Sequence, residues 1–279
     1  MPTFDTPEPI TATVDLPIGE IRVVASARSD TTVDVRSAAS DRAQAEAVRV
    51  ELVGRELRVT GPPLGLRQLL PKTPGRTLEI EIALPAGSAL SAQTGYGGVQ
   101  AEGRLDSCDI RTRYGDVRIE DATSAEIATS FGQVRVTGDI DGDADLAADH
   151  GGVRVRRVGG TAVLRSKHGG IRADRLAGEA RLTGTHGDIE VDVADADVRV
   201  RTAHGGVRLG RVARGEIFLT STHGRLEIGI APTSAAWLDL DTGGRVSNDL
   251  TAQDDPAGFA ETVSVHARSR EGAIVIRRA

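Results

Sequence analysis

Residues 181–212 read RLTGTHGDIEVDVADADVRVRTAHGGVRLGRV and contain two copies of one pattern. In each copy a His-Gly pair, His186-Gly187 or His204-Gly205, is followed by alternating apolar and polar residues. This alternation is typical of half-buried β-strands, because successive side chains of a strand point to opposite faces. The copies lie 18 residues apart. A unit this short cannot bury its own apolar face and must be stabilised by stacking on similar units.

The same pattern extends over most of the chain, anchored each time on an aromatic residue or His followed by Gly. The anchors are Tyr96-Gly97, Tyr114-Gly115, Phe131-Gly132, His150-Gly151, His168-Gly169, His186-Gly187, His204-Gly205 and His223-Gly224, with separations of 17 to 19 residues. A ninth unit follows at Thr242-Gly243, and a tenth at Glu271-Gly272 after a gap of 29 residues. The longer gap indicates an insertion around Ser247–Ala260. Near the other end, Ile18-Gly19 opens a segment of the same kind.

Apolar residues recur at fixed distances from each anchor. Around His204 they are Val207 and Leu209 after it, and Val200 and Val198 before it. Each unit therefore predicts two short strands, one on either side of the anchor, and nothing between residues 88 and 246 predicts a helix. Stacked units form an all-β, single-chain β-solenoid (β-helix-like), with coils of about 18 residues spaced about 4.8 Å apart.

The shared glycine has a structural explanation in such a stack. Only glycine turns tightly without a Cβ that collides with the coils above and below. We therefore predict a structural turn at eight positions. They are Gly97, Gly115, Gly132, Gly151, Gly169, Gly187, Gly205 and Gly224.

The regular repeat also suggests how the chain is divided. Residues 1–90 predict an irregular N-terminal β cap or start of the solenoid, with a Pro-rich loop at 61–75 and one or two helical turns at Ser40–Ala47. Residues 91–246 form the regular repeats, and residues 247–279 hold the loop insertion and the final coil. A cap is expected because an open solenoid end exposes unpaired strand edges.

The residues also resemble a known family. The recurring motif [ST]-x-[HYF]-G-[GD]-[VI]-x-[VA], together with LEIEIALPAGSALSAQTGYGGVQAEG at residues 78–103, is similar to bacterial putative-adhesin β-strand-repeat proteins. That family is a domain of unknown function, common in actinobacteria and related to envelope-stress operon proteins. The resemblance covers nearly the whole chain and implies a surface-exposed, adhesin-like protein. It supplies no catalytic residues.

Composition excludes several classes of protein. The chain has 279 residues with 34 basic and 40 acidic side chains, a formal net charge of −6, which argues against nucleic acid as the partner. One cysteine excludes a disulfide framework. No apolar run has the roughly 18 residues of a membrane span. The first residues, MPTFDTPEPITATVDLPIGE, lack the features of a signal peptide. This predicts a cytoplasmic protein, whereas the family resemblance implies surface association.

The histidines are the strongest candidates for chemistry. In a solenoid, five of the six would stack as a ladder at about 4.8 Å, and they are His150, His168, His186, His204 and His223. One interpretation is a metal-binding or pH-responsive stripe, because imidazole binds Zn, Cu or Ni and charges near neutral pH. The other is an aromatic stack at the turn, which is favoured because the same column begins with Tyr96, Tyr114 and Phe131.

Other features indicate no further chemistry. Cys108 falls in an inward apolar column, the acidic stretch 139–149 does not match a calcium loop, and the partial arginine rows are interrupted by acidic residues. No catalytic or cofactor-binding motif is present, so we expect neither an enzyme nor a cofactor. The favoured function is a non-catalytic adhesin-like or scaffold solenoid for an unknown protein or glycan partner, with end-to-end or lateral self-association open. The alternatives are the histidine module and a polysaccharide-acting β-helix enzyme.

Overall fold

The computed structural model describes residues 1–37, 42–63, 78–251 and 258–279, and strands make up most of them. The chain divides into two compact units, Met1–Gly138 and Asp139–Ala279. Most of the predicted loop at 61–75 lies outside the described residues. In the described part of the chain, no helix has the length and hydropathy that crossing a membrane requires.

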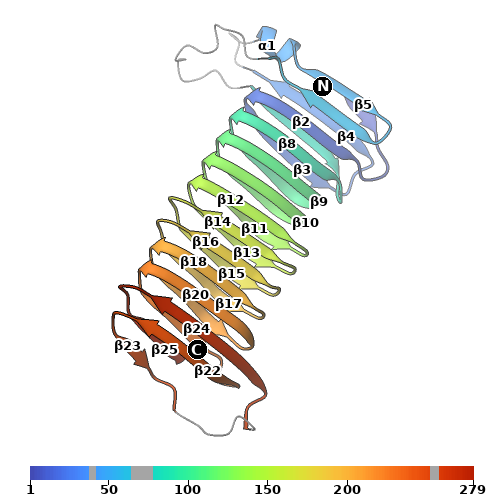
Figure 1. Ribbon diagram of the computed structural model, residues 1–279. Coiled ribbons are helices and arrows are strands. Elements are labelled where there is room, and N and C mark those ends of the chain that lie inside the picture. Colours follow the sequence, from blue (N-terminus) through green and yellow to red (C-terminus); the bar gives the residue numbers. More distant parts are fainter. Residues whose placement is uncertain (38–41, 64–77, 252–257) are drawn as a thin grey trace. The chain divides into compact units, whose positions relative to one another are not determined.

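The first unit is built from strands and one short helix (Figure 1). Its elements are β1 (Thr3–Asp5), β2 (Thr11–Ile18), β3 (Glu20–Ser26), β4 (Asp30–Arg36), α1 (Arg42–Glu46), β5 (Arg49–Val53), β6 (Glu56–Thr60), β7 (Glu79–Pro85), β8 (Ala89–Tyr96), β9 (Val99–Tyr114), β10 (Val117–Phe131) and β11 (Val134–Ile140), the last of which runs on into the second unit. Strands β9 and β10 are long because each continues from one face of the solenoid around to the other.

All the elements given for the described residues of the second unit are strands. They are β12 (Ala144–His150), β13 (Val153–Val158), β14 (Ala162–Ser166), β15 (Ile171–Leu176), β16 (Ala180–Gly184), β17 (Ile189–Ala194), β18 (Val198–His204), β19 (Val207–Val212), β20 (Gly215–His223), β21 (Leu226–Ile230), β22 (Ser234–Thr242), β23 (Val246–Asn248), β24 (Glu261–Ser269) and β25 (Ile274–Arg278).

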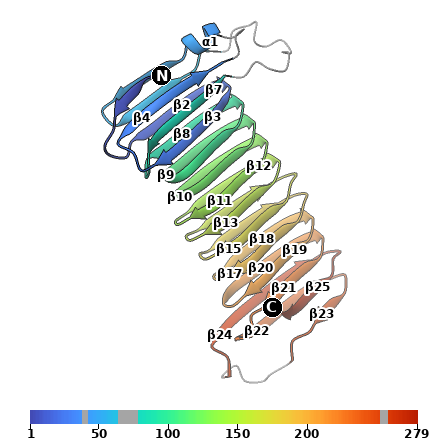
Figure 2. The same ribbon diagram turned by 180° about the vertical axis from the view of Figure 1, so that it is seen from behind.

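Each coil of the second unit contributes one strand to each of two parallel ladders. The even-numbered strands β12 to β20 pair in succession, and so do the odd-numbered strands β13 to β21. Figures 1 and 2 show these strands stacked side by side from the two sides. Register keeps equivalent residues together, so that Leu164, Leu182 and Val200 lie in one buried column. The predicted β-solenoid with two short strands per coil is confirmed.

The coils at the chain's C-terminal end do not stack in sequence order. Strand β24 pairs with β20 on one side and with β22 on the other, and β25 lies in the same way between β21 and β23. The final coil of the sequence is therefore inserted between two earlier coils.

The first unit has a corresponding insertion. Strand β2 pairs with both β6 and β8, and β3 pairs with both β7 and β9. Beyond this coil, β4 pairs antiparallel with β7, β1 with β4, and β5 with β6. The five-residue helix α1 precedes β5 in this part of the chain.

Candidate functional site

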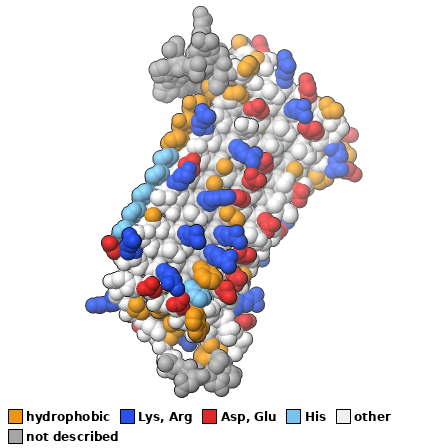
Figure 3. All heavy atoms as spheres, in the orientation of Figure 1, with side chains coloured by type: hydrophobic (Ala, Val, Ile, Leu, Met, Phe, Trp, Pro, Cys, Tyr) orange, Lys and Arg blue, Asp and Glu red, His pale blue; other side chains and the backbone are white. Residues whose placement is uncertain are grey.

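The five predicted histidines form a continuous exposed ladder at the end of the even-numbered strands. Successive ring centroids lie 4.6, 5.2, 5.1 and 4.9 Å apart, and the ring planes differ by 8 to 13°. Backbone register causes this stacking, since His204 pairs with both His186 and His223. Figure 3 shows the row of imidazoles along one edge of the second unit.

The geometry limits what the ladder can do chemically. The lone pairs of an imidazole lie in the ring plane, so parallel rings cannot direct several of them at one ion. In the ranges that the structure describes, no group of three or more His, Cys, Asp or Glu side chains is arranged to hold a metal. Protonation of neighbouring rings places two charges about 5 Å apart, a repulsion of about 1 kcal/mol in water. Acidic groups lie nearby: Asp149 is paired with Lys167 at 2.7 Å, and Glu271 lies 3.4 Å from His223.

The first unit carries an aromatic column at the equivalent position. Tyr96, Tyr114 and Phe131 stack with centroid separations of 4.8 Å and angles of 5 and 7°. Their side chains are 50, 39 and 43% exposed. Because the rings cover one another's faces, they present their edges and the two tyrosine hydroxyls to solvent.

The predicted turn glycines lie directly after these rings. At Gly187, where φ is +118°, an added Cβ would lie 2.6 Å from the carbonyl oxygen of Gly169 in the neighbouring coil. The same relation to a neighbouring turn glycine holds at other predicted positions. They are Gly97, Gly115, Gly132, Gly169, Gly205 and Gly224. Gly151 also has a positive φ.

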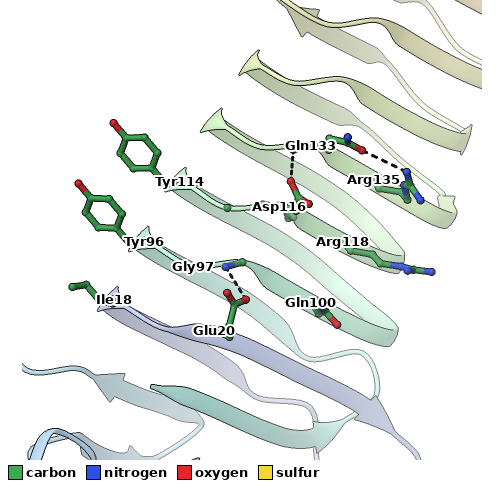
Figure 4. A pocket seen from close by; sticks show the side chains of 13 residues that line it. Ile18, Glu20, Tyr96, Gly97, Gln100, Tyr114, Asp116, Arg118, Gln133 and Arg135 are labelled. Carbon is green, nitrogen blue, oxygen red and sulfur yellow. Dashed lines mark hydrogen bonds between the residues drawn. The ribbon is translucent and has the colours of Figure 1, made fainter. Parts of the chain in front are cut away.

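A pocket of about 620 Å³ opens beside the aromatic column of the first unit (Figure 4). Gly98 is one of its lining residues, and the backbone is closely approached there: an added Cβ would lie 2.8 Å from Glu20 Oε2 and 3.0 Å from the backbone carbonyl oxygen of Asp116. Both carboxylates are held by the backbone: Glu20 accepts a hydrogen bond from the amide of Gly98, and Asp116 from the amide of Gln133, each at 2.8 Å. They are therefore fixed in place before any ligand arrives.

The rest of the pocket wall consists of planar hydrogen-bonding groups. These are the side chains of Gln100, Arg118, Gln133 and Arg135. Arg135 reaches the amide oxygen of Gln133 at 3.5 Å, and Arg118 forms no ion pair within the described part of the chain. At two matching positions of the second unit the arginine is paired, with Arg172 on Glu190 at 3.0 Å and Arg208 near Glu227 at 3.8 Å.

A second cluster, which sequence reasoning missed, lies on the outer face of the second unit's even-numbered strands. We call it the Trp237 cluster. It comprises Arg199, Phe218, Trp237, Asp239, Ser264, His266 and Arg268. The insertion of β24 builds it, because His266 thereby lies between Phe218 on β20 and Asp239 on β22. A stacking order taken from the sequence would not bring these residues together.

Contacts within the Trp237 cluster fix its rings. The His266 ring stacks on the Phe218 ring, with a centroid separation of 4.6 Å and an angle of 7° between the planes. The guanidinium carbon of Arg199 lies 5.3 Å from the centroid of the Phe218 ring. Trp237 is tilted by 57° against His266, with centroids 5.2 Å apart. Asp239 bridges His266, at 3.2 Å, and Arg268, at 3.0 Å.

Three of these residues lie in the order of a hydrolytic triad. Ser264 Oγ is 3.4 Å from His266 Nε2, and His266 Nδ1 is 3.2 Å from Asp239 Oδ2. Acyl transfer also needs donors for the developing oxyanion. Ser264 lies inside β24, which pairs on both sides with β20 and β22, so the neighbouring amides are used in the sheet. The arrangement therefore orients the imidazole and favours binding over catalysis.

The remaining sequence candidates have structural roles. Burial raises the pKa of the Cys108 thiol to about 12, which makes it a poor nucleophile. In the acidic stretch, Asp139, Asp145 and Asp149 pair with Arg156, Arg165 and Lys167. Asp143 accepts a hydrogen bond from the backbone amide of Thr161. In this structure these carboxylates therefore bind groups of the chain itself on the outer strand face.

Comparison with protein families matches residues 13–216 to the family described as Toastrack DUF4097. The chain belongs to this family. None of the curated proteins matches the chain in sequence.

Comparison with solved structures matches the chain to several bacterial proteins. A "putative adhesin" of Bacteroides fragilis is 15% identical with a TM-score of 0.42, over 100% of this chain and 95% of that one. A "putative adhesin" of Parabacteroides distasonis is 12% identical with a TM-score of 0.36, over 99% and 95%. A "putative cell adhesion protein" of Clostridium sporogenes is 10% identical with a TM-score of 0.26, over 100% and 98%.

Proposed function

We propose that this Toastrack protein is a non-catalytic, adhesin-like binding protein that presents the regular outer surface of its solenoid to a protein or glycan partner. The pocket at Gly98 carries the proposal. It is open to solvent, its two carboxylates are held by backbone amides, and amide and guanidinium groups complete its wall. Most ligand sites combine a concave surface with a few fixed polar groups in this way.

The chemistry of the pocket favours a glycan over a protein segment. Carboxylates, amides and guanidinium groups are planar and can each bind two neighbouring hydroxyls of a sugar. Tyr96 and Tyr114 also line the pocket, with their hydroxyls directed away from Glu20 and Asp116 (Figure 4). A protein partner would instead favour a larger apolar core at the contact.

A glycan array with the purified full-length chain tests this function. We expect binding to a restricted set of glycans, weakened at least tenfold by Arg118→Gln. Arg172→Gln, which changes the paired arginine at the matching position of the second unit, serves as the control and should bind normally. Absence of glycan binding by the unmodified chain would overturn the glycan proposal. Turnover of a glycan or ester that is abolished by one substitution would overturn the non-catalytic one.

The histidine ladder carries a second candidate, a pH-responsive or metal-binding module built on His150, His168, His186, His204 and His223. Its support is the continuous row of five exposed imidazoles, each about 5 Å from the next, because imidazole is both a common metal ligand and a common pH-sensitive group. Acidic groups near the ladder include Asp149 and Glu271, and Lys167 adds a positive charge. Calorimetric titration with Zn²⁺ and Ni²⁺ at pH 7.5 tests the metal function, and a flat titration would exclude it.

Location in the cell is part of the proposal. An adhesin-like protein must reach the membrane or the cell surface, as the family resemblance implies, or must act on a partner inside the cell. Fractionation of the native host with antibody detection distinguishes these cases. Recovery in surface washes supports the adhesin function, and recovery in the cytosol alone would direct the search to an intracellular partner. Light scattering of the same preparation tests end-to-end or lateral self-association.

A further inference from the structure

Trp237 is the single tryptophan of the chain and lies on the outer face of β22 with 59% of its surface exposed. An indole ring left in water forgoes the large gain of burying an aromatic side chain. Other strands of the same face, such as β14 and β16, carry mainly charged and small polar side chains at outward positions, for example Arg165, Arg181 and Thr183. The indole is not an isolated apolar side chain, because it contacts the His266 ring, which in turn stacks on Phe218.

The groups around the indole are fixed by contacts that a surface side chain does not usually have. His266 is held between Phe218 and Trp237 and is linked to Asp239 and Ser264. Asp239 Oδ2 is used by His266 and Arg268, and its side chain remains 37% exposed. The structure therefore presents an aromatic ring with a carboxylate, a guanidinium and an imidazole at its edge, all prearranged.

Size and polarity determine which partner fits. A stable protein interface needs about 800 Å² from each partner with an apolar core, whereas this cluster offers one free ring within a polar surface. One indole matches the dimensions of one pyranose ring, whose C–H groups give it an apolar face. The hydroxyls of such a sugar would reach the polar edge formed by Asp239 and Arg268. Figure 3 shows the cluster as apolar and histidine side chains surrounded by charged ones.

We propose that the Trp237 cluster is a carbohydrate-binding platform on which a pyranose ring stacks against the indole while Asp239 and Arg268 bind its hydroxyls. The platform rests on the proposed glycan-binding function but is separate from the pocket at Gly98. It depends on the insertion of β24, which supplies His266 and Arg268 to β22. The site is therefore a product of the out-of-order final coil.

The single tryptophan makes the proposal directly measurable, because all indole fluorescence comes from the site. The experiment titrates the full-length chain with the oligosaccharides that the glycan array selects, and follows both fluorescence and calorimetric binding. We expect the Trp237 fluorescence to change saturably as glycan is added, and the midpoint of this change to coincide with the midpoint of the calorimetric binding curve. Trp237→Ala should weaken glycan binding at least tenfold relative to the unmodified chain. Trp237→Phe should weaken it less than Trp237→Ala does, and Asp239→Asn should weaken it several-fold. Val246→Ala, which alters another exposed apolar side chain at the same end, should bind normally.

The outcomes separate the platform from the general function. If the unmodified chain binds a glycan but its emission is constant and Trp237→Ala binds equally well, the platform is wrong and the glycan function stands. If the unmodified chain binds no glycan in calorimetry or on the array, both are wrong. Circular dichroism of each variant confirms folding, and Trp237→Phe keeps the test decisive should Trp237→Ala be destabilised.

Discussion

Gly187 is a position where the repeat allows almost no change. Its backbone has a φ of +118°, and an added Cβ would lie 2.6 Å from the carbonyl oxygen of Gly169. Both backbone strain and overlap with a neighbouring coil therefore oppose a side chain. We expect Gly187→Val to lower the free energy of unfolding by about 3 kcal/mol or more. Thermal unfolding measures this, with Gly258→Ala as control because no atom of the described residues lies within 4 Å of its added Cβ. Equal melting of Gly187→Val and the unmodified chain would contradict the turn geometry.

The buried thiol of Cys108 makes the free energy of unfolding depend on pH in the alkaline range. The folded state holds the thiol's pKa at about 12, raised from 9.0 by burial. Because the folded state keeps the proton that the unfolded state loses, stability is unaffected below pH 9 and declines between pH 9 and 12, by at most about 1.4 kcal/mol per pH unit. Urea unfolding at several pH values measures the slope. Cys108→Ala, which reproduces the small residue Ala125 of the adjacent strand, should remove this contribution. An unchanged slope in that variant would show that the thiol is not responsible.

Strand β16 illustrates how successive residues of a strand alternate between the buried core and the solvent-exposed face. Leu182 is 1% exposed and lies between Leu164 and Val200, whereas the adjacent Arg181 faces solvent beside Glu179. Leu182→Asp would bury an unpaired charge, and we expect a loss of several kcal/mol or failure to fold. Arg181→Asp adds the same residue one position away and should change stability by less than about 1 kcal/mol. Chemical denaturation compares the two, and similar losses in both would contradict the register.

Alternation along each strand was sufficient to predict the buried columns, the coil length and the stacked histidines, because these depend on spacing within and between adjacent units. The order of the coils at both ends was not predictable in this way. The outward and inward positions of β22 and β24 follow the same alternation, so either strand fits against β20. The sequence between β23 and β24 does not show this alternation of apolar and polar residues. Phe218, Trp237 and His266 come together only through this order, so the Trp237 cluster could not be inferred from the repeat.

Near each end of the chain, one coil is inserted between two other coils. In the first unit the earliest complete coil, β2 and β3, is paired on both sides, and in the second unit the last coil, β24 and β25, is paired on both sides. A coil that is flanked on both sides has no free edge to fray or to recruit another chain. These two coils are thus held by later or earlier coils. Among the described strands, β22 and β23 have one partner each and come from the interior of the sequence, whereas the N-terminal strand β1 pairs with β4 alone.

This arrangement reverses the usual order of local stability along a chain. Termini are normally the first segments to open. Here we expect slow hydrogen exchange in residues 11–26 and 261–278, and faster exchange in residues 234–248, because β22 and β23 pair on one side only among the described strands. Exchange followed by mass spectrometry on the full-length chain measures all three segments in one experiment, with residues 198–212 of the regular repeats as the protected reference. Rapid exchange in 261–278 would contradict the insertion of β24 and, with it, the geometry of the Trp237 cluster.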